Sequence, residues 1–169
     1  MHDEILDLVN DNDEVIGSLS RSEVYARKLH NFRVVNAFIV NSKGQLWIPR
    51  RTKNKSSYPN ALDMSMGGHV GSGETYEDAA RREISEELNI DITQVPFRLL
   101  GHLTPNQHNT NCFMKVYEIR LDVAPTYNPE DYYEYFWLTP SEVLEKVSQD
   151  GPAKEDLPIL VKHFYIPQP

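Results

Sequence analysis

The sequence predicts an α/β protein, because one short chain carries strong signals for both strands and helices. Runs of β-branched and aromatic residues flank a glycine-containing turn in 33–49, which is typical of a β-hairpin. Apolar residues recur every four positions in 76–88, as they do on one face of a helix. A length of 169 residues fits one domain. With 40% hydrophobic and 25% charged residues, the composition is that of a globular protein that can form a core without a disulfide or a structural metal.

The N-terminal part is predicted to form a hairpin and a short helix. Apolar residues on either side of a polar turn indicate two short strands within 4–19, and 22–29 is the expected helix. The hairpin also offers a surface for a homodimer. The strands 33–40 and 45–49 follow as the expected centre of the sheet. The polar, basic segment 50–60 has no periodicity, so we expect a surface loop there.

A glycine-rich stretch, 64–73, leads into the most regular helix signal of the chain. Thr75 is the expected N-cap, and Asp78 three residues later completes a capping box. The helix is expected to end at Asn89, since asparagine tolerates the left-handed conformation found just past a helix end. Its apolar stripe consists of Tyr76, Ala80, Ile84 and Leu88.

The C-terminal half is predicted to add three strands and two helices. The strands are expected at 97–104, 112–121 and 135–138, with an irregular segment at 123–133. A helix is expected from 140 to 148, since threonine, proline and glutamate occupy its N-cap, first and third positions. The last helix is expected at 154–165, with Pro158 breaking or shortening its start.

The charge of the chain limits its partners. Twenty-five acidic against 17 basic residues give a net charge of −8, so the protein repels nucleic acid and anionic membrane surfaces. No apolar run approaches the ~18 residues of a membrane span, and the acidic start does not resemble a signal peptide. Cys112 is the one cysteine, which excludes an intramolecular disulfide and a cysteine-based zinc site. We therefore expect a cytoplasmic protein in which Cys112 is an inert core thiol.

Three glutamates are predicted to share one face of the helix at 76–88. Glu83, Glu86 and Glu87 are related by three and four positions, so their like charges repel one another. A cation would relieve this repulsion, and carboxylate oxygens suit magnesium or manganese. Arg82 lies beside them and can pair with Glu74 or Glu86. A solvated acidic helix face is the alternative interpretation of the three glutamates taken alone.

The spacing of these residues resembles the signature of the Nudix hydrolase family, G-x5-E-x7-R-E-U-x-E-E-x-G-U, where U is apolar. Eight of its nine specified positions match, namely Gly68, Glu74, Arg82, Glu83, Ile84, Glu86, Glu87 and Ile90. The departure is Asn89, where the family has glycine. Asparagine is the next best residue for a helix C-cap, so we expect the local geometry to be intact.

The resemblance implies a Nudix-type α/β/α sandwich around a mixed β-sheet. It covers about 32–164, with an N-terminal extension at 1–31 and a C-terminal tail at 165–169. In the family the helix glutamates bind one to three divalent cations, here Mg²⁺ or Mn²⁺, together with the carbonyl of the glycine before the signature. The corresponding residues are Glu83, Glu86, Glu87 and Gly67, and one of these glutamates often deprotonates the attacking water. Glu74 and Arg82 have an orienting role in this scheme.

Other residues are candidates for binding the substrate. Arg50 and Arg51 end a predicted strand, and arginine forks fit phosphate oxygens, although a solvated loop is the alternative. His69 follows the glycine pair, where it could reach a phosphate or a metal. Glu134 is a candidate for the extra carboxylate that many Nudix proteins carry in this region. The aromatic residues of 127–136 either stack a base or pack the edge of the sheet.

Outside the signature, the chain is most similar to the Nudix subgroup related to isopentenyl-diphosphate isomerase. The isomerase needs a cysteine where this chain has Gly67, and an E-x-E pair where it has Asn109 and Asn111. Isomerases also tend to have a degenerate signature, whereas this chain keeps every acidic position. We therefore expect a hydrolase that cleaves the diphosphate linkage of a nucleoside di- or triphosphate or a related derivative. An isomerase-like enzyme and a catalytically silent nucleotide sensor are the alternatives.

Overall fold

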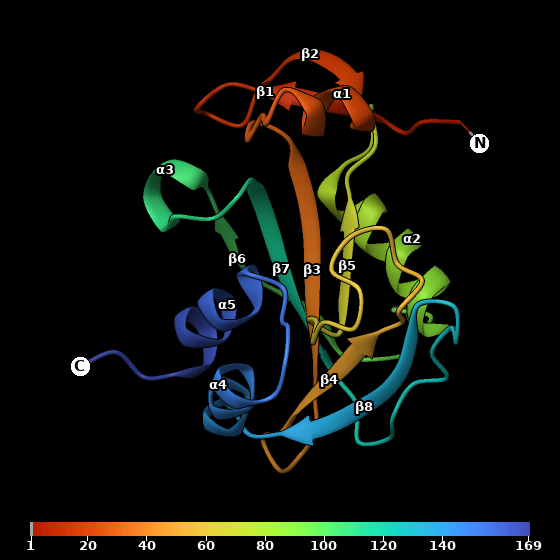
Figure 1. Cartoon of the computed structure of the whole chain (residues 1–169), viewed down its shortest axis with the longest axis vertical. Coiled ribbons are helices and arrows are strands. Elements are labelled where there is room, and N and C mark those ends of the chain that lie inside the picture. The colour runs from red at the N-terminus through yellow and green to blue at the C-terminus, as the bar shows by residue number, and fades with distance from the viewer. Residues whose placement is uncertain (1) are drawn as a thin grey trace.

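The computed structural model describes residues 2–169, so Met1 of the expected extension lies outside it. Within these residues, a mixed six-stranded sheet forms the centre of the molecule (Figure 1). Its strands are β3 (Arg33–Val40), β4 (Leu46–Arg51), β5 (Met66–His69), β6 (Phe97–Leu103), β7 (Phe113–Arg120) and β8 (Tyr132–Leu138). The order is β6-β7-β3-β4-β8, with β5 also paired to β3. β3 and β7 run parallel, and the other neighbours are antiparallel.

Helices cover both faces of the sheet, which confirms the expected sandwich. On one face, α2 (Tyr76–Leu88) buries the stripe that its four-residue spacing predicts. On the other, α4 (Pro140–Gln149) and α5 (Asp156–Tyr165) bury Val143, Leu157 and Leu160. We call these two sides the α2 face and the α4–α5 face. Each has its own apolar cluster, because successive residues of a strand point to opposite sides.

The N-terminal residues form a separate two-stranded sheet at one end of the molecule (Figure 1). It consists of β1 (Ile5–Val9) and β2 (Val15–Ser20), and α1 (Arg21–Ala26) follows it. Leu6 and Val24 from this unit are fully buried in the cluster of the α4–α5 face. The carboxylate of Asp7 also accepts hydrogen bonds from the Ser72 hydroxyl (2.7 Å) and the Gly73 amide (3.0 Å). The extension therefore shares a core and hydrogen bonds with the rest of the chain, and its boundary at 31 stays a prediction.

The sheet opens between β3 and β4. β3 pairs with β4 near the turn that joins them, whereas the first half of β3 pairs with β5. The segment 61–65 fills the opening and bonds to the end of β4. Ser65 links the two sides, because its hydroxyl accepts from the Ile39 amide (2.8 Å) and donates to the Trp47 carbonyl (2.6 Å). We call this segment the wedge.

Tertiary structure adds two elements that sequence patterns do not predict. β5 contains Gly67 and Gly68, which have low strand propensity, and its pairing with β3 makes it a strand. α3 (Pro105–His108) is a single turn, too short for any periodicity. β8 begins at Tyr132, earlier than expected, and α5 begins at Asp156, which places Pro158 in the tolerant first turn.

The end of α2 confirms the role expected for Asn89. Asn89 adopts the left-handed conformation, with φ of 54° and ψ of 35°, and its amide nitrogen donates to the Ser85 carbonyl (3.0 Å). Its side chain also donates to the Thr126 carbonyl. Asparagine thus supplies here what glycine supplies in the family signature.

We predict that Asn89→Ala lowers the free energy of unfolding by about 1–2 kcal/mol, because alanine is strained in this conformation. Asn89→Gly removes the side-chain hydrogen bond and relaxes the backbone, so its effect should stay within about 1 kcal/mol. Urea denaturation of the three proteins measures both changes. Equal losses for the two variants would contradict the backbone argument.

Candidate active site

Arg82 joins helix α2 to the loop that follows β5. Its Nε and Nη2 donate to Oε1 and Oε2 of Glu74 (2.8 and 2.9 Å), and Nη2 also donates to the His69 carbonyl (3.2 Å). Glu74 accepts a third hydrogen bond from the Gly71 amide (2.8 Å). The hydrogen bonds from Arg82, together with this amide, lower the pKa of Glu74. This bidentate ion pair between Arg82 and Glu74 fixes the position of the glycine loop relative to α2.

Glu83 lies against the backbone of β5. Its side chain is 14% exposed, and Oε1 accepts from Nη1 of Arg82 (2.7 Å). A Cβ atom added to Gly68 would lie 2.3 Å from the Glu83 carboxyl carbon, so a larger residue would displace this carboxylate. Burial raises the pKa of Glu83, although the hydrogen bond and charge of Arg82 oppose that effect.

Glu87, one helical turn further along, is half-buried as well. Burial raises its pKa to about 8, and the negative charges of Glu83 and Asp63 act in the same direction. Tyr132, itself fully buried on β8, donates its hydroxyl hydrogen to Oε2 of Glu87 (3.0 Å). Sequence analysis did not single out this role for Tyr132, because the contact joins residues that are 45 positions apart.

Glu86 occupies the rim of the site. Its side chain is 62% exposed, and its nearest cation is Nη1 of Arg82 at 3.6 Å. Among residues 2–169, no three histidine, cysteine, aspartate or glutamate side chains are close enough together to hold a metal ion. Glu83 and Glu87 each point toward a separate partner, so convergence on one cation requires their side chains to rotate.

Asp63 is a second buried carboxylate beside the site, and no sequence motif marks it. It lies on the wedge and is 1% exposed. Its Oδ2 accepts from Nη1 of Arg51 (2.8 Å), whose Nε and Nη2 donate to the Ser57 carbonyl (3.3 and 3.1 Å). Arg51 pairs across the sheet with Tyr132, the residue that contacts Glu87. The structure thus brings Arg51 close to the predicted catalytic glutamates.

The structure separates Arg50 from Arg51, although the sequence analysis placed both at the phosphate. Consecutive strand residues point to opposite faces, and Arg50 lies on the α4–α5 face. It is 7% exposed, and it donates to Glu134 (2.6 Å), to Asp150 (3.2 Å) and to a backbone carbonyl. Arg50 therefore pairs with the partly exposed Glu134 on this face, and neither residue belongs to the proposed site.

His69 is also directed away from the glutamates. Its Nε2 is 2.8 Å from the Tyr25 hydroxyl, and its ring stacks on Phe32 with centroids 5.8 Å apart. Burial lowers its pKa to about 3, so the imidazole is neutral and offers no positive charge to a phosphate. His69 connects β5 to the N-terminal unit, and it too is left out of the proposed site.

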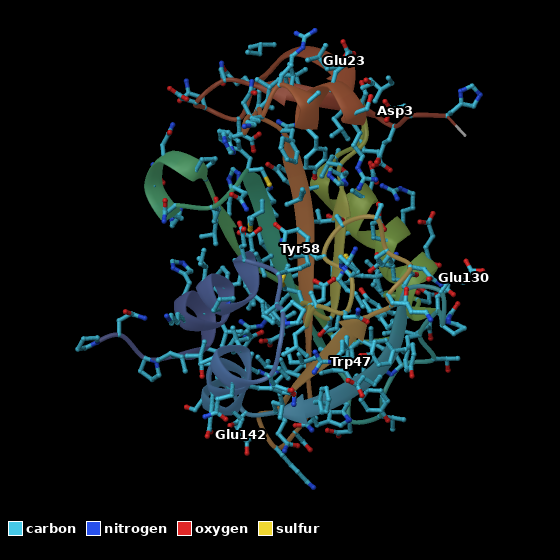
Figure 2. The ribbon with its side chains drawn as sticks, viewed as in Figure 1. Asp3, Glu23, Trp47, Tyr58, Glu130 and Glu142 are labelled. Atoms are coloured by element: carbon cyan, nitrogen blue, oxygen red, sulfur yellow. The ribbon has the colours of Figure 1, made fainter. Side chains whose placement is uncertain are left out.

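Aromatic residues at the edge of the sheet pack together. Trp47, labelled on β4 in Figure 2, is fully buried, and its ring contacts those of Tyr127, Tyr132 and Tyr135. These contacts favour the packing role that the sequence left open. Cys112 is 3% exposed, and burial raises the pKa of its thiol, which fits an inert core residue.

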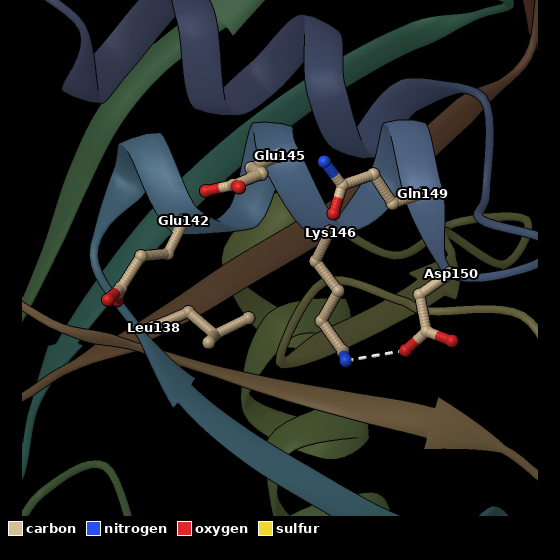
Figure 3. Close-up of a pocket in the computed structure, with 6 residues that line it drawn as sticks. All are labelled: Leu138, Glu142, Glu145, Lys146, Gln149 and Asp150. Atoms are coloured by element: carbon tan, nitrogen blue, oxygen red, sulfur yellow. Dashed lines mark hydrogen bonds and ion pairs between the residues drawn. The ribbon is translucent and has the colours of Figure 1, made fainter.

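A surface hollow of about 500 Å³ lies over α4, on the other face of the sheet from α2 (Figure 3). Its lining includes Glu142, Glu145 and Asp150 against the single cation of Lys146. An acidic lining of this kind does not suit a phosphate, so the hollow is not part of the candidate site. In residues 2–169 we find no helix long and apolar enough to cross a membrane.

Comparison with known proteins gives consistent results. The NUDIX domain family matches residues 30–157. An uncharacterized Nudix hydrolase of Nostoc sp. is 58% identical over 162 residues, which make up 96% of each chain. A Nudix hydrolase of Deinococcus radiodurans is 50% identical over 163 residues, 96% of this chain and 95% of that protein. The crystal structure of DR0079 from D. radiodurans superposes with a TM-score of 0.90 at 49% identity, covering 96% of this chain and 99% of that one.

We predict that Glu74→Gln lowers the free energy of unfolding by about 1–2 kcal/mol, because a charge-assisted pair with Arg82 is lost. Glu77→Gln, in the first turn of α2, is the matched control. Glu77 is 65% exposed and pairs with the exposed Arg81 (3.0 Å), so its loss should cost no more than about 0.5 kcal/mol. Urea denaturation at neutral pH measures both. Equal effects would show that the Glu74 pair is no stronger than a surface pair.

Proposed function

The chain belongs to the Nudix hydrolase family, and on that premise we propose that it cleaves the diphosphate linkage of a nucleoside di- or triphosphate or a related nucleoside diphosphate derivative. Water attacks phosphorus and releases a nucleoside monophosphate; the other product is phosphate from a diphosphate, pyrophosphate from a triphosphate, or the phosphorylated remainder of a derivative. The observation that carries the proposal is the pair of half-buried carboxylates on one face of α2, Glu83 against Gly68 and Glu87 against the Tyr132 hydroxyl.

We propose a divalent cation, Mg²⁺ or Mn²⁺, as cofactor, which the donor chemistry suits once the glutamate side chains rotate toward one another. Glu87 is a half-buried carboxylate that lacks a cationic hydrogen-bond partner among residues 2–169, and the carboxylates of Glu83 and Asp63 add further negative charge near it. A cation would offset this charge, and hard oxygen donors suit both metals. Glu83, Glu86, Glu87 and the carbonyl of Gly67 are the proposed ligands. When bound, the metal would neutralise phosphate charge and acidify water.

The protein's own residues orient this site. Arg82 and Glu74 set the position of α2, Gly68 leaves space for the Glu83 carboxylate, and Tyr132 holds Glu87 by its hydroxyl. Arg51 supplies positive charge next to them for the outer phosphate. We leave the identity of the general base open among the three glutamates.

The two alternatives have less support. An isomerase would need a thiol at position 67, and the one cysteine is buried among core residues at 112. A sensor would bind nucleotide without turnover, but this chain keeps the acidic residues of the signature.

The proposal is tested by a substrate screen with Mg²⁺ or Mn²⁺ in which the nucleotide and phosphate products are separated by anion-exchange chromatography. The panel contains nucleoside di- and triphosphates, nucleotide sugars, dinucleoside polyphosphates and isopentenyl diphosphate. We expect turnover that excess chelator abolishes, and Glu87→Gln should lower kcat by at least about 10² because metal-assisted charge stabilisation is lost. Glu77→Gln is the control and should retain full activity. Full activity in chelator would refute the metal site, and tight nucleotide binding without turnover would favour the sensor.

A second prediction separates the neighbouring arginines. If Arg51 binds phosphate alike in the ground and transition states, Arg51→Ala raises KM more than it lowers kcat. Arg50→Ala should instead lower the free energy of unfolding and leave KM within about twofold, because Arg50 is bonded to Glu134 and Asp150 on the other face. Kinetics on the best substrate and urea denaturation measure both. An unchanged KM in Arg51→Ala would remove it from the phosphate site.

A further inference from the structure

The buried carboxylate of Asp63 has an incomplete set of partners. Its Oδ2 is bonded to Arg51, but its Oδ1 is buried and has no hydrogen-bond partner among residues 2–169. A buried ionised carboxylate is costly unless cations lie close to both oxygens. The cation nearest to Oδ1 is Nζ of Lys154, at 3.6 Å. This distance is that of an ion pair and is longer than a hydrogen bond, so the ammonium is held loosely.

Lys154 reaches this position through its backbone. It belongs to the connection between α4 and α5, more than 90 residues away from Asp63 along the chain. Its amide nitrogen donates to the Leu62 carbonyl (2.9 Å), and the preceding Ala153 forms a parallel bridge with Leu62. The lysine backbone is therefore fixed beside the wedge, while the side chain keeps 22% exposure and can meet a ligand.

Lys154 also lies close to the proposed metal site. A Cβ atom added to Gly67, whose carbonyl is a proposed ligand, would lie 3.5 Å from the lysine Nζ. The next residue, Gly68, contacts Glu83. The ammonium group thus faces the backbone of β5 from the α4–α5 side, whereas the glutamates approach the same strand from α2.

The charges in direct contact leave an excess of positive charge. Arg51 and Lys154 share the single carboxylate of Asp63. Asp156 is close enough to Lys154 to interact with its charge, and burial raises the pKa of the Asp156 carboxyl, which disfavours its charged form. Glu155, the next residue after Lys154, is exposed and accepts a hydrogen bond from Asn111 (3.2 Å). The lysine ammonium has three N–H donors, and Arg51 keeps a second N–H on each terminal nitrogen. Two cations that keep N–H donors available beside the proposed metal site suit the binding of a phosphoryl group.

We propose that Lys154 binds a phosphoryl group of the substrate, and that Asp63 is the positioning residue that holds Lys154 and Arg51 side by side for this purpose. The inference rests on the proposed function, because it assigns a phosphate subsite to the same reaction. It explains why a buried aspartate is paired with two cations that come from opposite faces of the sheet.

The test is direct binding of methylenediphosphonate, a diphosphate analogue that is not hydrolysed, in the presence of Mg²⁺. Isothermal titration calorimetry compares the wild type with Lys154→Met and with the control Lys162→Met, which makes the same charge change at an exposed position of α5. We expect Lys154→Met to raise Kd at least about tenfold, Lys162→Met to stay within about twofold, and Lys154→Arg to keep most of the affinity. Equal Kd values for the two methionine variants, or no binding by the wild type, would overturn the proposal.

Two further measurements complete the experiment. If Lys154→Met does not fold because Asp63 is left unpaired, Lys154→Gln, which keeps an N–H donor but not the charge, is compared with Lys162→Gln, and equal Kd values for that pair would overturn the proposal. Hydrolysis of the best substrate is measured separately. If the wild type hydrolyses the substrate and Lys154→Met hydrolyses it with an unchanged KM, the phosphate subsite is overturned and the proposed hydrolase activity stands. Binding that depends on Lys154, without turnover on any substrate, would overturn the hydrolase and support the subsite.

Discussion

The guanidinium group of Arg82 is the interaction on which the site depends. It contacts Glu74 before the helix, Glu83 within it and the His69 carbonyl of β5. One planar fork therefore sets both the distance and the rotation of α2 relative to the sheet. Given that rotation, Glu83 meets Gly68, Glu87 meets the Tyr132 hydroxyl and Glu86 stays at the rim. The acidic face of the helix becomes an asymmetric set of carboxylates with different environments.

The opening between β3 and β4 is the second determinant. Because β5 takes the place of β4 beside the first half of β3, a gap forms that the wedge must fill. Ser65 satisfies the free backbone groups on its two sides, and Asp63 becomes buried within reach of both faces. A buried carboxylate needs cations, which arrive as Arg51 from β4 and Lys154 from the connection before α5. The ion pairs of Asp63 with Arg51 and Lys154 thus connect the two faces of the sandwich.

Sequence patterns predicted most of the fold and the central part of the candidate site. Local periodicity predicted the apolar stripe on α2 and the strands at 33–40 and 112–121. Capping chemistry predicted the left-handed conformation of Asn89 at the end of α2. Strand β5 could not be predicted from the sequence, since its two glycines carry no strand signal. Its pairing with β3 makes the segment a strand. Arg50 and Arg51 were grouped because they are adjacent in sequence, yet strand alternation sends them to opposite faces.

By itself the sequence determined the sandwich class, the helix that carries Glu83, Glu86 and Glu87, and the membership in a hydrolase family, because these depend on local spacing and on a signature. Only the tertiary structure decided which carboxylates are buried and which basic residues stand beside them. Burial and pairing join residues such as Glu87 with Tyr132, or Asp63 with Lys154, that are far apart along the chain. Such contacts arise from strand order and from the packing of helices on each face, and local sequence carries no signal for them.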